Sequence, residues 1–380
     1  IDMTQITPFA IETSEQELTD LKQRLALTRW PDKETPTDWS QGIPLSYMIE
    51  IHDYWLNDYD WPARLGLLNQ WPGFKTEIDG LGIHFLHIKS TEPNALPLLM
   101  THGWPGSIVE FQKVIGPLTN PTEYGGLASD AFDLVIPTLP GFGYSDKPVS
   151  PGWNIDRIAT AWDELMVRLG YDRYVAQGGD WGSIVTAQIG VQNLGHCIGI
   201  HMNMPIAPPD PNTMDKLTDQ ETDALKSMQF YQDHDSGYSK QQSTRPQTLG
   251  YGLADSPIGQ AAWIIEKFYQ WMDCDGHPEN AASRDELLDN VMMYWLPDAG
   301  ASSARIYWES FGSTNLDPIE LPVGCTLFPK EIFKTSERWA RTRFTNLIHF
   351  EVMEKGGHFA AFEQPQTLVE QLRNCFRQLR

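Results

Sequence analysis

The stretch VAQGGDWGSI, residues 175–184, has the pattern Gly-x-Asp-x-Gly between an apolar run and a helix-like run. Glycines at Gly178 and Gly182 allow a sharp strand-to-helix turn that presents the central side chain to a cleft. Hydrolytic enzymes often place a serine nucleophile at this point, but here the residue is Asp180. Because short patterns recur by chance, an aspartate that caps the following helix is an equally good interpretation of this pattern alone.

An alternation of strands and helices surrounds this turn. Apolar strands are predicted in residues 95–107, 132–143, 174–182 and 197–204, and a helix in residues 183–194. This rhythm is typical of a doubly wound, mostly parallel sheet, in which catalytic side chains follow the carboxyl ends of the strands. The sequence therefore predicts an α/β fold with Asp180 at a strand end.

The pattern of predicted strands and helices divides the chain into four segments. Residues 91–204 and 317–380 carry the strand-helix rhythm and are predicted to form one core, of which VGCTLFPKE and IHFEVMEKGGHF are the later strands. Residues 205–316 interrupt it with aromatic helical stretches such as AAWIIEKFYQWM and LDNVMMYWL, which indicates a helical lid. Residues 1–90 are predicted to be helix-rich, with Ser14 and Glu17 capping the first helix and a hairpin that turns at Asp79–Gly80.

Composition excludes several classes of protein. The chain has 380 residues and a formal net charge of −22, which argues against nucleic acid or an anionic membrane surface as partner. No apolar run approaches the ~20 residues that span a bilayer, and the start of the chain does not resemble a signal peptide. The four cysteines are far apart in the sequence, so free thiols are expected rather than disulfides or a metal site.

Two further motifs complete a candidate catalytic set. HGWPGS, residues 102–107, directly follows an apolar strand, as does the turn that supplies an oxyanion-hole amide in α/β hydrolases; here that amide is the N–H of Trp104. EKGGHF, residues 354–359, places His358 in a glycine-rich loop near the C-terminus, where a general base is expected. Glu331, just beyond a predicted strand, and Glu354, four residues before His358, are both candidates for the acid that orients the imidazole, and the strand-end position favours Glu331.

A carboxylate nucleophile indicates a particular chemistry. Asp180 would attack an alkyl carbon, and the resulting ester would carry the enzyme's own carbonyl, which water then attacks. The substrate is therefore an alkyl electrophile, either an epoxide or an alkyl halide. An epoxide oxygen needs a proton donor as the ring opens, and Tyr238 and Tyr307 in the lid are available; with 13 tyrosines in the chain, either alone is more typical of packing.

The motifs together resemble a known family, the microsomal-type epoxide hydrolases. The resemblance rests on HGWPGS, PTLPGFGYSDKP, QGGDWGS, SGYSKQQSTRPQT, SPIGQAAWIIEKF, LFPKEI and EKGGHFAAFEQP. The opening PFAIETSEQELTDLKQRLALTRWP resembles the N-terminal meander that wraps the core in that family. The resemblance covers nearly the whole chain and implies an α/β-hydrolase fold with a helical lid.

The resemblance also implies roles for seven residues. These are Asp180 as nucleophile, His358 as base, Glu331 as charge-relay acid, Tyr238 and Tyr307 as ring-opening acids, and the Trp104 and Trp181 amides as oxyanion-hole donors. It is the resemblance, and not spacing, that selects the two tyrosines. Mammalian microsomal members begin with a membrane anchor, and no such segment is recognised here, so the chain is expected to resemble the soluble microbial or fungal branch.

The expected activity is cofactor-free and metal-free hydrolysis of a small apolar epoxide to a vicinal diol. A cytoplasmic location is expected, and a homodimer is compatible with the sequence. The nearest alternative is a haloalkane dehalogenase, which would use the same three residues and indole N–H donors, with Trp181 near the halide. A non-catalytic ligand-binding module on the same fold is disfavoured because the nucleophile, base and acid are all present.

Overall fold

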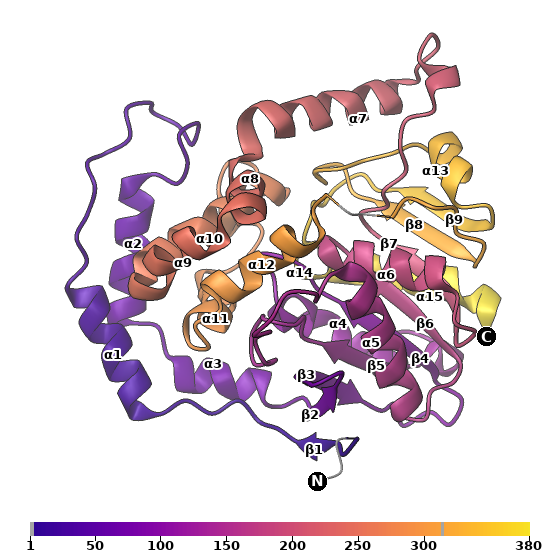
Figure 1. Cartoon of the computed structure of the whole chain (residues 1–380), viewed down its shortest axis with the longest axis horizontal. Coiled ribbons are helices and arrows are strands. Elements are labelled where there is room, and N and C mark those ends of the chain that lie inside the picture. Colours follow the sequence, from indigo (N-terminus) through magenta and orange to yellow (C-terminus); the bar gives the residue numbers. More distant parts are fainter. Residues whose placement is uncertain (1–3, 313–314) are drawn as a thin grey trace.

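A sheet of nine strands forms the centre of the described part of the chain, residues 4–312 and 315–380 of a computed structural model (Figure 1). The strand order is β1-β2-β3-β5-β4-β6-β7-β8-β9. The six strands from β5 to β9 in this order are parallel. At one edge β3 pairs antiparallel with β5, β2 with β3, and β1 with β2. The predicted mostly parallel sheet is therefore confirmed. The strands are β1 (Thr7–Pro8), β2 (Gly73–Ile78), β3 (Leu81–Ile88), β4 (Leu96–Thr101), β5 (Phe132–Pro137), β6 (Tyr174–Gly178), β7 (Cys197–Met202), β8 (Val323–Leu327) and β9 (Leu347–Val352).

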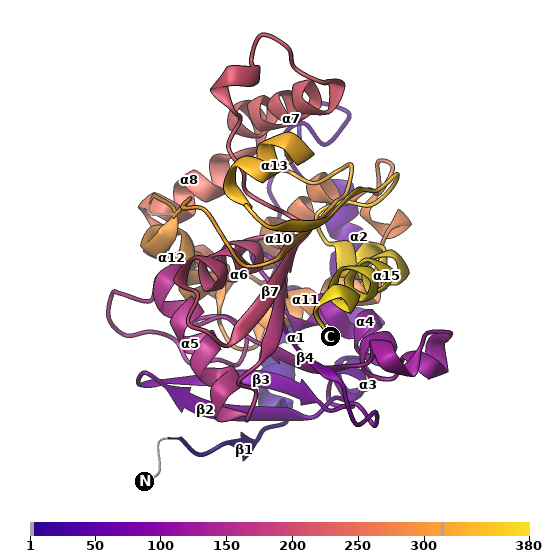
Figure 2. The ribbon, with the colours of Figure 1, turned by 90° about the vertical axis from the view of Figure 1, so that its right-hand side faces the viewer.

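Helices cover both faces of the sheet. Figure 2 shows α5 and α6 on one face and α4 and α15 on the other. Ile158, Trp162 and Leu165 of α5 are buried at helical spacing, which gives this helix one apolar side that packs inward. The helices of the core are α4 (Gln112–Thr119), α5 (Ile155–Arg168), α6 (Trp181–Gln192), α13 (Glu337–Arg343), α14 (Ala360–Glu363) and α15 (Pro365–Phe376).

The parallel register brings the carboxyl ends of the strands together. Thr101 at the end of β4 pairs with Gly178 at the end of β6, and Gly178 pairs with Met202 at the end of β7. Met202 pairs in turn with Cys325 of β8. The loops that follow these strands therefore meet at one edge, where a site in an open α/β sheet is expected.

A helical insertion lies between β7 and β8, as predicted from the aromatic stretches. Figure 1 shows most of its helices between the core and the N-terminal helices, with its first helix, Asp219–Phe230, above them. A π-helical turn, Tyr231–Asp235, joins the first two of them. The helices are α7 (Asp219–Phe230), α8 (Gly237–Thr244), α9 (Pro246–Asp255), α10 (Pro257–Trp271), α11 (Arg284–Trp295) and α12 (Gly300–Ser310). Residues 1–3 and 313–314, which fall within the predicted meander and lid, lie outside the described residues.

The N-terminal segment passes around the outer side of the insertion. Its helices are α1 (Glu15–Ala26), α2 (Leu45–Asn57) and α3 (Trp61–Leu68), and Figure 1 shows α1 and α2 beside α9 and α10. The predicted capping box is present, because the Ser14 hydroxyl accepts from the Glu17 amide and the Glu17 carboxylate accepts from the Ser14 amide. The predicted hairpin of β2 and β3 also forms, with Asp79 and Gly80 both at positive φ.

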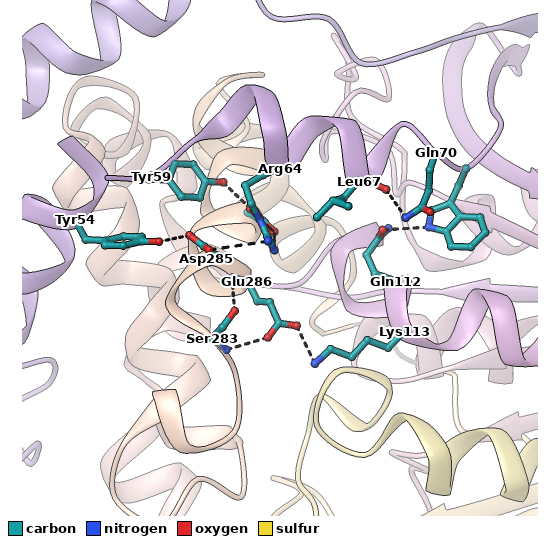
Figure 3. A network of polar contacts seen from close by, with 12 residues as sticks. Tyr54, Tyr59, Arg64, Leu67, Gln70, Gln112, Lys113, Ser283, Asp285 and Glu286 are labelled. Carbon is teal, nitrogen blue, oxygen red and sulfur yellow. Dashed lines mark hydrogen bonds and ion pairs between the residues drawn. The ribbon is translucent and has the colours of Figure 1, made fainter. Parts of the chain in front are cut away.

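Polar contacts hold the insertion to the N-terminal segment and to the core. Figure 3 shows Tyr54 of α2 donating to Asp285 of α11, at 2.6 Å. Glu286, also in the first turn of α11, forms an ion pair with Lys113 of α4 at 2.8 Å. One turn further along α11, the Asp289 carboxylate accepts from Tyr59 at 2.6 Å and from Nη2 of Arg64 at 2.7 Å. These contacts place the insertion relative to the sheet.

We expect Asp289→Ala to lower the free energy of unfolding by about 3 kcal/mol, since it leaves the Arg64 guanidinium and the Tyr59 hydroxyl without their acceptor. Asp289 is well buried, whereas Arg341 and Glu337 form a half-exposed pair within one helix. Arg341→Ala is therefore the control, with an expected loss of about 0.3–0.5 kcal/mol. Thermal unfolding of both variants at one scan rate checks this, and equal unfolding temperatures would contradict it.

In residues 4–312 and 315–380, every helix is too short or too polar to cross a bilayer. Cys197, Cys274, Cys325 and Cys375 are buried free thiols, as predicted from their spacing.

Candidate active site

Asp180 occupies a strained turn between β6 and α6. Its backbone has φ 52° and ψ −132°, a conformation that residues with a side chain rarely adopt. An added Cβ on Gly178 would lie 2.0 Å from the carbonyl oxygen of Gly182, and one on Gly182 would lie 1.9 Å from that of Thr101. Only glycine therefore fits at these two positions. The Asp180 side chain makes no capping bond to α6, so the alternative of a helix-capping aspartate is not what the structure shows.

Each oxygen of the Asp180 carboxylate has a defined partner. Oδ1 accepts from the backbone amide of Trp104 at 2.7 Å, and Oδ2 contacts Nε2 of His358 at 3.0 Å. An added Cβ on Gly103 would lie 2.2 Å from Oδ1, so the HGWPGS loop approaches the carboxylate closely because it has glycine there. Trp181 follows Asp180 at the first position of α6, where a backbone amide has no partner within the helix.

His358 lies between two carboxylates. Nδ1 makes a short hydrogen bond with Oε1 of Glu331, and both side chains are almost fully buried. The backbone amide of His358 donates to the carbonyl of Trp271 at 2.9 Å, which ties this loop to α10. Burial alone would lower the pKa of His358, but the charge of Glu331 and the hydrogen bond to Asp180 outweigh it and raise the pKa well above its usual value.

The structure brings Glu331 and not Glu354 to the imidazole. Glu331 is 3% exposed and also accepts from the Ile332 amide at 2.9 Å, which fixes its carboxylate. Glu354 is exposed on the loop before His358. A solvated carboxylate cannot orient a buried ring, so the geometry favours Glu331 for the acid.

Tyr238 of α8 and Tyr307 of α12 meet beside the Asp180 turn. Their ring centroids are 5.8 Å apart, with the planes at 85°. The ring of Tyr238 stacks on that of Trp104, with centroids 5.1 Å apart, and the rings of Tyr307 and Trp181 are perpendicular, with centroids 5.0 Å apart. Burial raises the pKa of both phenols well above the usual value, and the nearby Asp180 charge adds to this. Both phenols therefore keep their protons near neutral pH and can act as donors.

Sequence reasoning missed several residues that surround Tyr238. The hydroxyl of Tyr231 lies 2.7 Å from that of Tyr238. Nζ of Lys267 lies 4.9 Å from the centroid of the Tyr238 ring and forms a buried ion pair with Asp235, which also accepts from the Trp271 indole. Lys267 and Trp271 are four residues apart on α10, and this spacing was the signal in the sequence that could have placed them on one face.

Comparisons with known proteins show the family to which the chain belongs. Residues 6–111 match the family model described as the epoxide hydrolase N terminus, and residues 97–258 match the model of the alpha/beta hydrolase fold. A Stigmatella aurantiaca protein, named provisionally as an epoxide hydrolase, is 53% identical over 99% of this chain and 86% of its own length. Epoxide hydrolase 1 of Sus scrofa is 35% identical over 97% of this chain and 88% of its own length.

Solved structures are also similar over the whole chain. The epoxide hydrolase of Aspergillus niger has a TM-score of 0.90 at 32% identity, covering 99% of this chain and 97% of its own. The juvenile hormone epoxide hydrolase of Bombyx mori has a TM-score of 0.90 at 31% identity, covering 98% and 94%. The predicted fold class and family resemblance are therefore confirmed.

Proposed function

We propose that this chain, which belongs to the epoxide hydrolase family of α/β hydrolases, converts an apolar epoxide to a vicinal diol through an ester on Asp180. The observation that carries the proposal is the Asp180 carboxylate itself, held by the Trp104 amide at 2.7 Å and by Nε2 of His358 at 3.0 Å. A carboxylate so held can attack carbon and then accept charge on its own carbonyl oxygen.

In the first step, an Asp180 oxygen bonds to a ring carbon as the epoxide C–O bond breaks. The epoxide oxygen takes the electron pair of that bond and a proton from Tyr238 or Tyr307. The resulting phenolate recovers a proton from His358, because the pKa of His358 falls once Asp180 has become a neutral ester. The enzyme is then a hydroxyalkyl ester with a neutral imidazole.

In the second step, neutral His358 removes a proton from water as the water oxygen bonds to Cγ of Asp180. Glu331 holds the ring orientation and stabilises the imidazolium. The Trp104 and Trp181 amides are the proposed donors to the oxyanion, and each such donor is worth about 3 kcal/mol of barrier. The ester C–O bond then breaks, the diol oxygen takes the second water proton, and the carboxylate and the protonated histidine are restored.

The aromatic side chains around the carboxylate support an apolar substrate. Trp104, Trp181, Trp271, Tyr238 and Tyr307 are all buried beside it. Such walls bind apolar groups, and the few polar groups among them orient the reacting oxygen.

The cytoplasmic location and the homodimer stay predictions. Sedimentation of the purified chain tests whether it forms a homodimer.

The test of the proposed function is diol formation from a panel of aryl and alkyl epoxides, with halide release from alkyl halides assayed beside it. We expect diol and no halide. The relatives named epoxide hydrolases and the paired tyrosines do not favour the haloalkane dehalogenase alternative. Halide release without diol would overturn the proposal.

We expect Tyr307→Phe and Tyr238→Phe each to slow ester formation about 10²-fold, because each removes one of two proton donors to the epoxide oxygen. Single-turnover kinetics with excess enzyme measure this step directly. Tyr251 on α9 is 69% exposed, and Tyr251→Phe is the control with no expected change. Ester formation at the wild-type rate in both active-site variants would count against the assigned roles.

A further inference from the structure

Tyr231 is a buried phenol that touches Tyr238 and has no role in the steps proposed so far. It is the first residue of the π-helical turn Tyr231–Asp235, and Tyr238 lies seven residues later on α8. The two phenol oxygens are 2.7 Å apart, a typical distance for an O–H···O hydrogen bond. Both side chains are buried, so bulk water does not compete for this contact. π-helical turns are rare in proteins and are frequent at functional sites.

The hydrogen bonds of Ser239 restrict which groups can donate in this cluster. The Ser239 hydroxyl donates to the carbonyl of Ser236 at 2.8 Å. Because a hydroxyl has only one proton, Oγ of Ser239 can only accept from the Tyr231 hydroxyl, which lies 3.2 Å away. The Tyr231 proton therefore has two possible acceptors, Oγ of Ser239 and the phenol oxygen of Tyr238. When it points to Tyr238, that phenol accepts, and the Tyr238 proton is free for another acceptor.

A Tyr238 phenolate would need such a donor in this environment. Burial raises the pKa of Tyr238 well above its usual value, and the neighbouring tyrosines and Asp180 add to this shift. Lys267 lies beside the Tyr238 ring, but its ammonium is already paired with Asp235 at 2.8 Å and with Glu266 at 3.1 Å. A hydroxyl that donates to the phenol oxygen binds more strongly as negative charge develops there, because hydrogen bonds to charged groups are roughly twice as strong as neutral ones.

We propose that Tyr231 is a positioning residue for ring opening, which donates a hydrogen bond to Tyr238 as that phenol protonates the epoxide oxygen; the inference rests on the proposed function. An Asp180 oxygen bonds to a ring carbon, the epoxide C–O bond breaks, and the epoxide oxygen takes that electron pair and the Tyr238 proton. The electron pair of the broken O–H bond stays on the Tyr238 oxygen, which accepts from Tyr231 until it is protonated again. Tyr231 keeps its own proton throughout.

The experiment removes the one donor with Tyr231→Phe, which keeps the ring. Enzyme in excess, at several concentrations, is mixed with one epoxide of the panel, and rapid quenching followed by mass spectrometry measures the ester and the diol separately. We expect the limiting rate of ester formation to fall about tenfold, because the phenolate loses its donor. The enzyme concentration that gives half of this rate, and the rate of ester hydrolysis, should both stay unchanged.

Tyr171→Phe is the matched control for the loss of a tyrosine hydroxyl. The Tyr171 hydroxyl donates to Asp133 at 2.9 Å, near the amino end of β5 and so away from the carboxyl ends of the strands. We expect this variant to form and hydrolyse the ester at the wild-type rates. Ser239→Ala is a second test, because it removes the competing acceptor of the Tyr231 proton. Ester formation in this variant should be as fast as in wild type or faster.

A double-mutant cycle separates action through Tyr238 from a structural role of Tyr231. In the Tyr238→Phe enzyme, Tyr231→Phe should slow ester formation no further, because no phenol oxygen remains to accept its hydrogen bond. In the Tyr307→Phe enzyme, the same change should still slow ester formation.

Four results would each overturn the inference. They are ester formation at the wild-type rate in Tyr231→Phe, the same loss in the Tyr238→Phe background, slowing of ester hydrolysis by the same factor, and a loss in Ser239→Ala as large as that in Tyr231→Phe. Failure of the wild type to form ester or diol from any epoxide would instead overturn the proposed function.

Discussion

Asp180→Ala is expected to abolish diol formation, with a loss on the order of 10⁶-fold, because removal of a covalent nucleophile disables the whole catalytic set. The Trp104 amide and His358 would then have no carboxylate between them. Chromatographic assay of diol from the epoxide panel, run beside wild type, measures the effect. The unfolding temperature of the variant serves as the control for folding, since the turn at Asp180 is strained.

An isotope experiment tests whether Asp180 acts as a nucleophile or only as a general base for water. In a single turnover in ¹⁸O-water, the diol should carry no label. One of its oxygens comes from the epoxide, and the oxygen on the attacked carbon comes from the Asp180 carboxylate. The label should appear in Asp180 and then in the diol of later turnovers. Label in the diol of the first turnover would show direct attack by water and would contradict the ester route.

His358→Gln is expected to trap the enzyme as the ester. Ester formation needs the Asp180 carboxylate and the tyrosine donors, whereas ester hydrolysis needs a neutral imidazole to take the water proton. We expect hydrolysis to fall about 10⁴-fold, so that the intact protein gains the mass of one epoxide molecule. Intact-protein mass spectrometry after mixing with excess epoxide measures this adduct.

The matched control for the trapped ester is the double variant Asp180→Ala with His358→Gln, which should gain no mass. Digestion should locate the adduct on the peptide that contains Asp180. Sustained diol turnover by the single His358→Gln variant, at more than a few per cent of the wild-type rate, would contradict the role assigned to His358. Asp180, Trp104 and the tyrosines are unchanged in this variant, so it keeps the groups that form the ester.

Local sequence determined the elements that carry the site. The Gly-x-Asp-x-Gly turn, the HGWPGS loop after β4 and the capping box of Ser14 and Glu17 all depend on residues within a few positions of one another. Alternating apolar strands and helices predicted the mostly parallel sheet, whose register brings the loops together. For these features, steric limits and hydrogen bonds between near neighbours are sufficient, and the predictions were confirmed.

Family motifs singled out Tyr238 and Tyr307, but the residues around them did not follow from the sequence. Nothing local shows that Tyr231 contacts Tyr238 through a π-helical turn, or that Lys267 and Asp235 form a buried pair beside them. The contacts of Asp289 with Tyr59 and Arg64 likewise join residues more than 220 positions apart. Such pairs form only when the N-terminal segment has packed against the insertion.

The chemical state of the site was decided by tertiary structure alone. From the sequence, Glu331 and Glu354 were both candidates for the acid, and only burial separates them, since Glu331 is enclosed with His358 while Glu354 is exposed. Sequence determines which groups can ionise and which turns can form, but desolvation and charge proximity depend on neighbours that only the folded chain brings together.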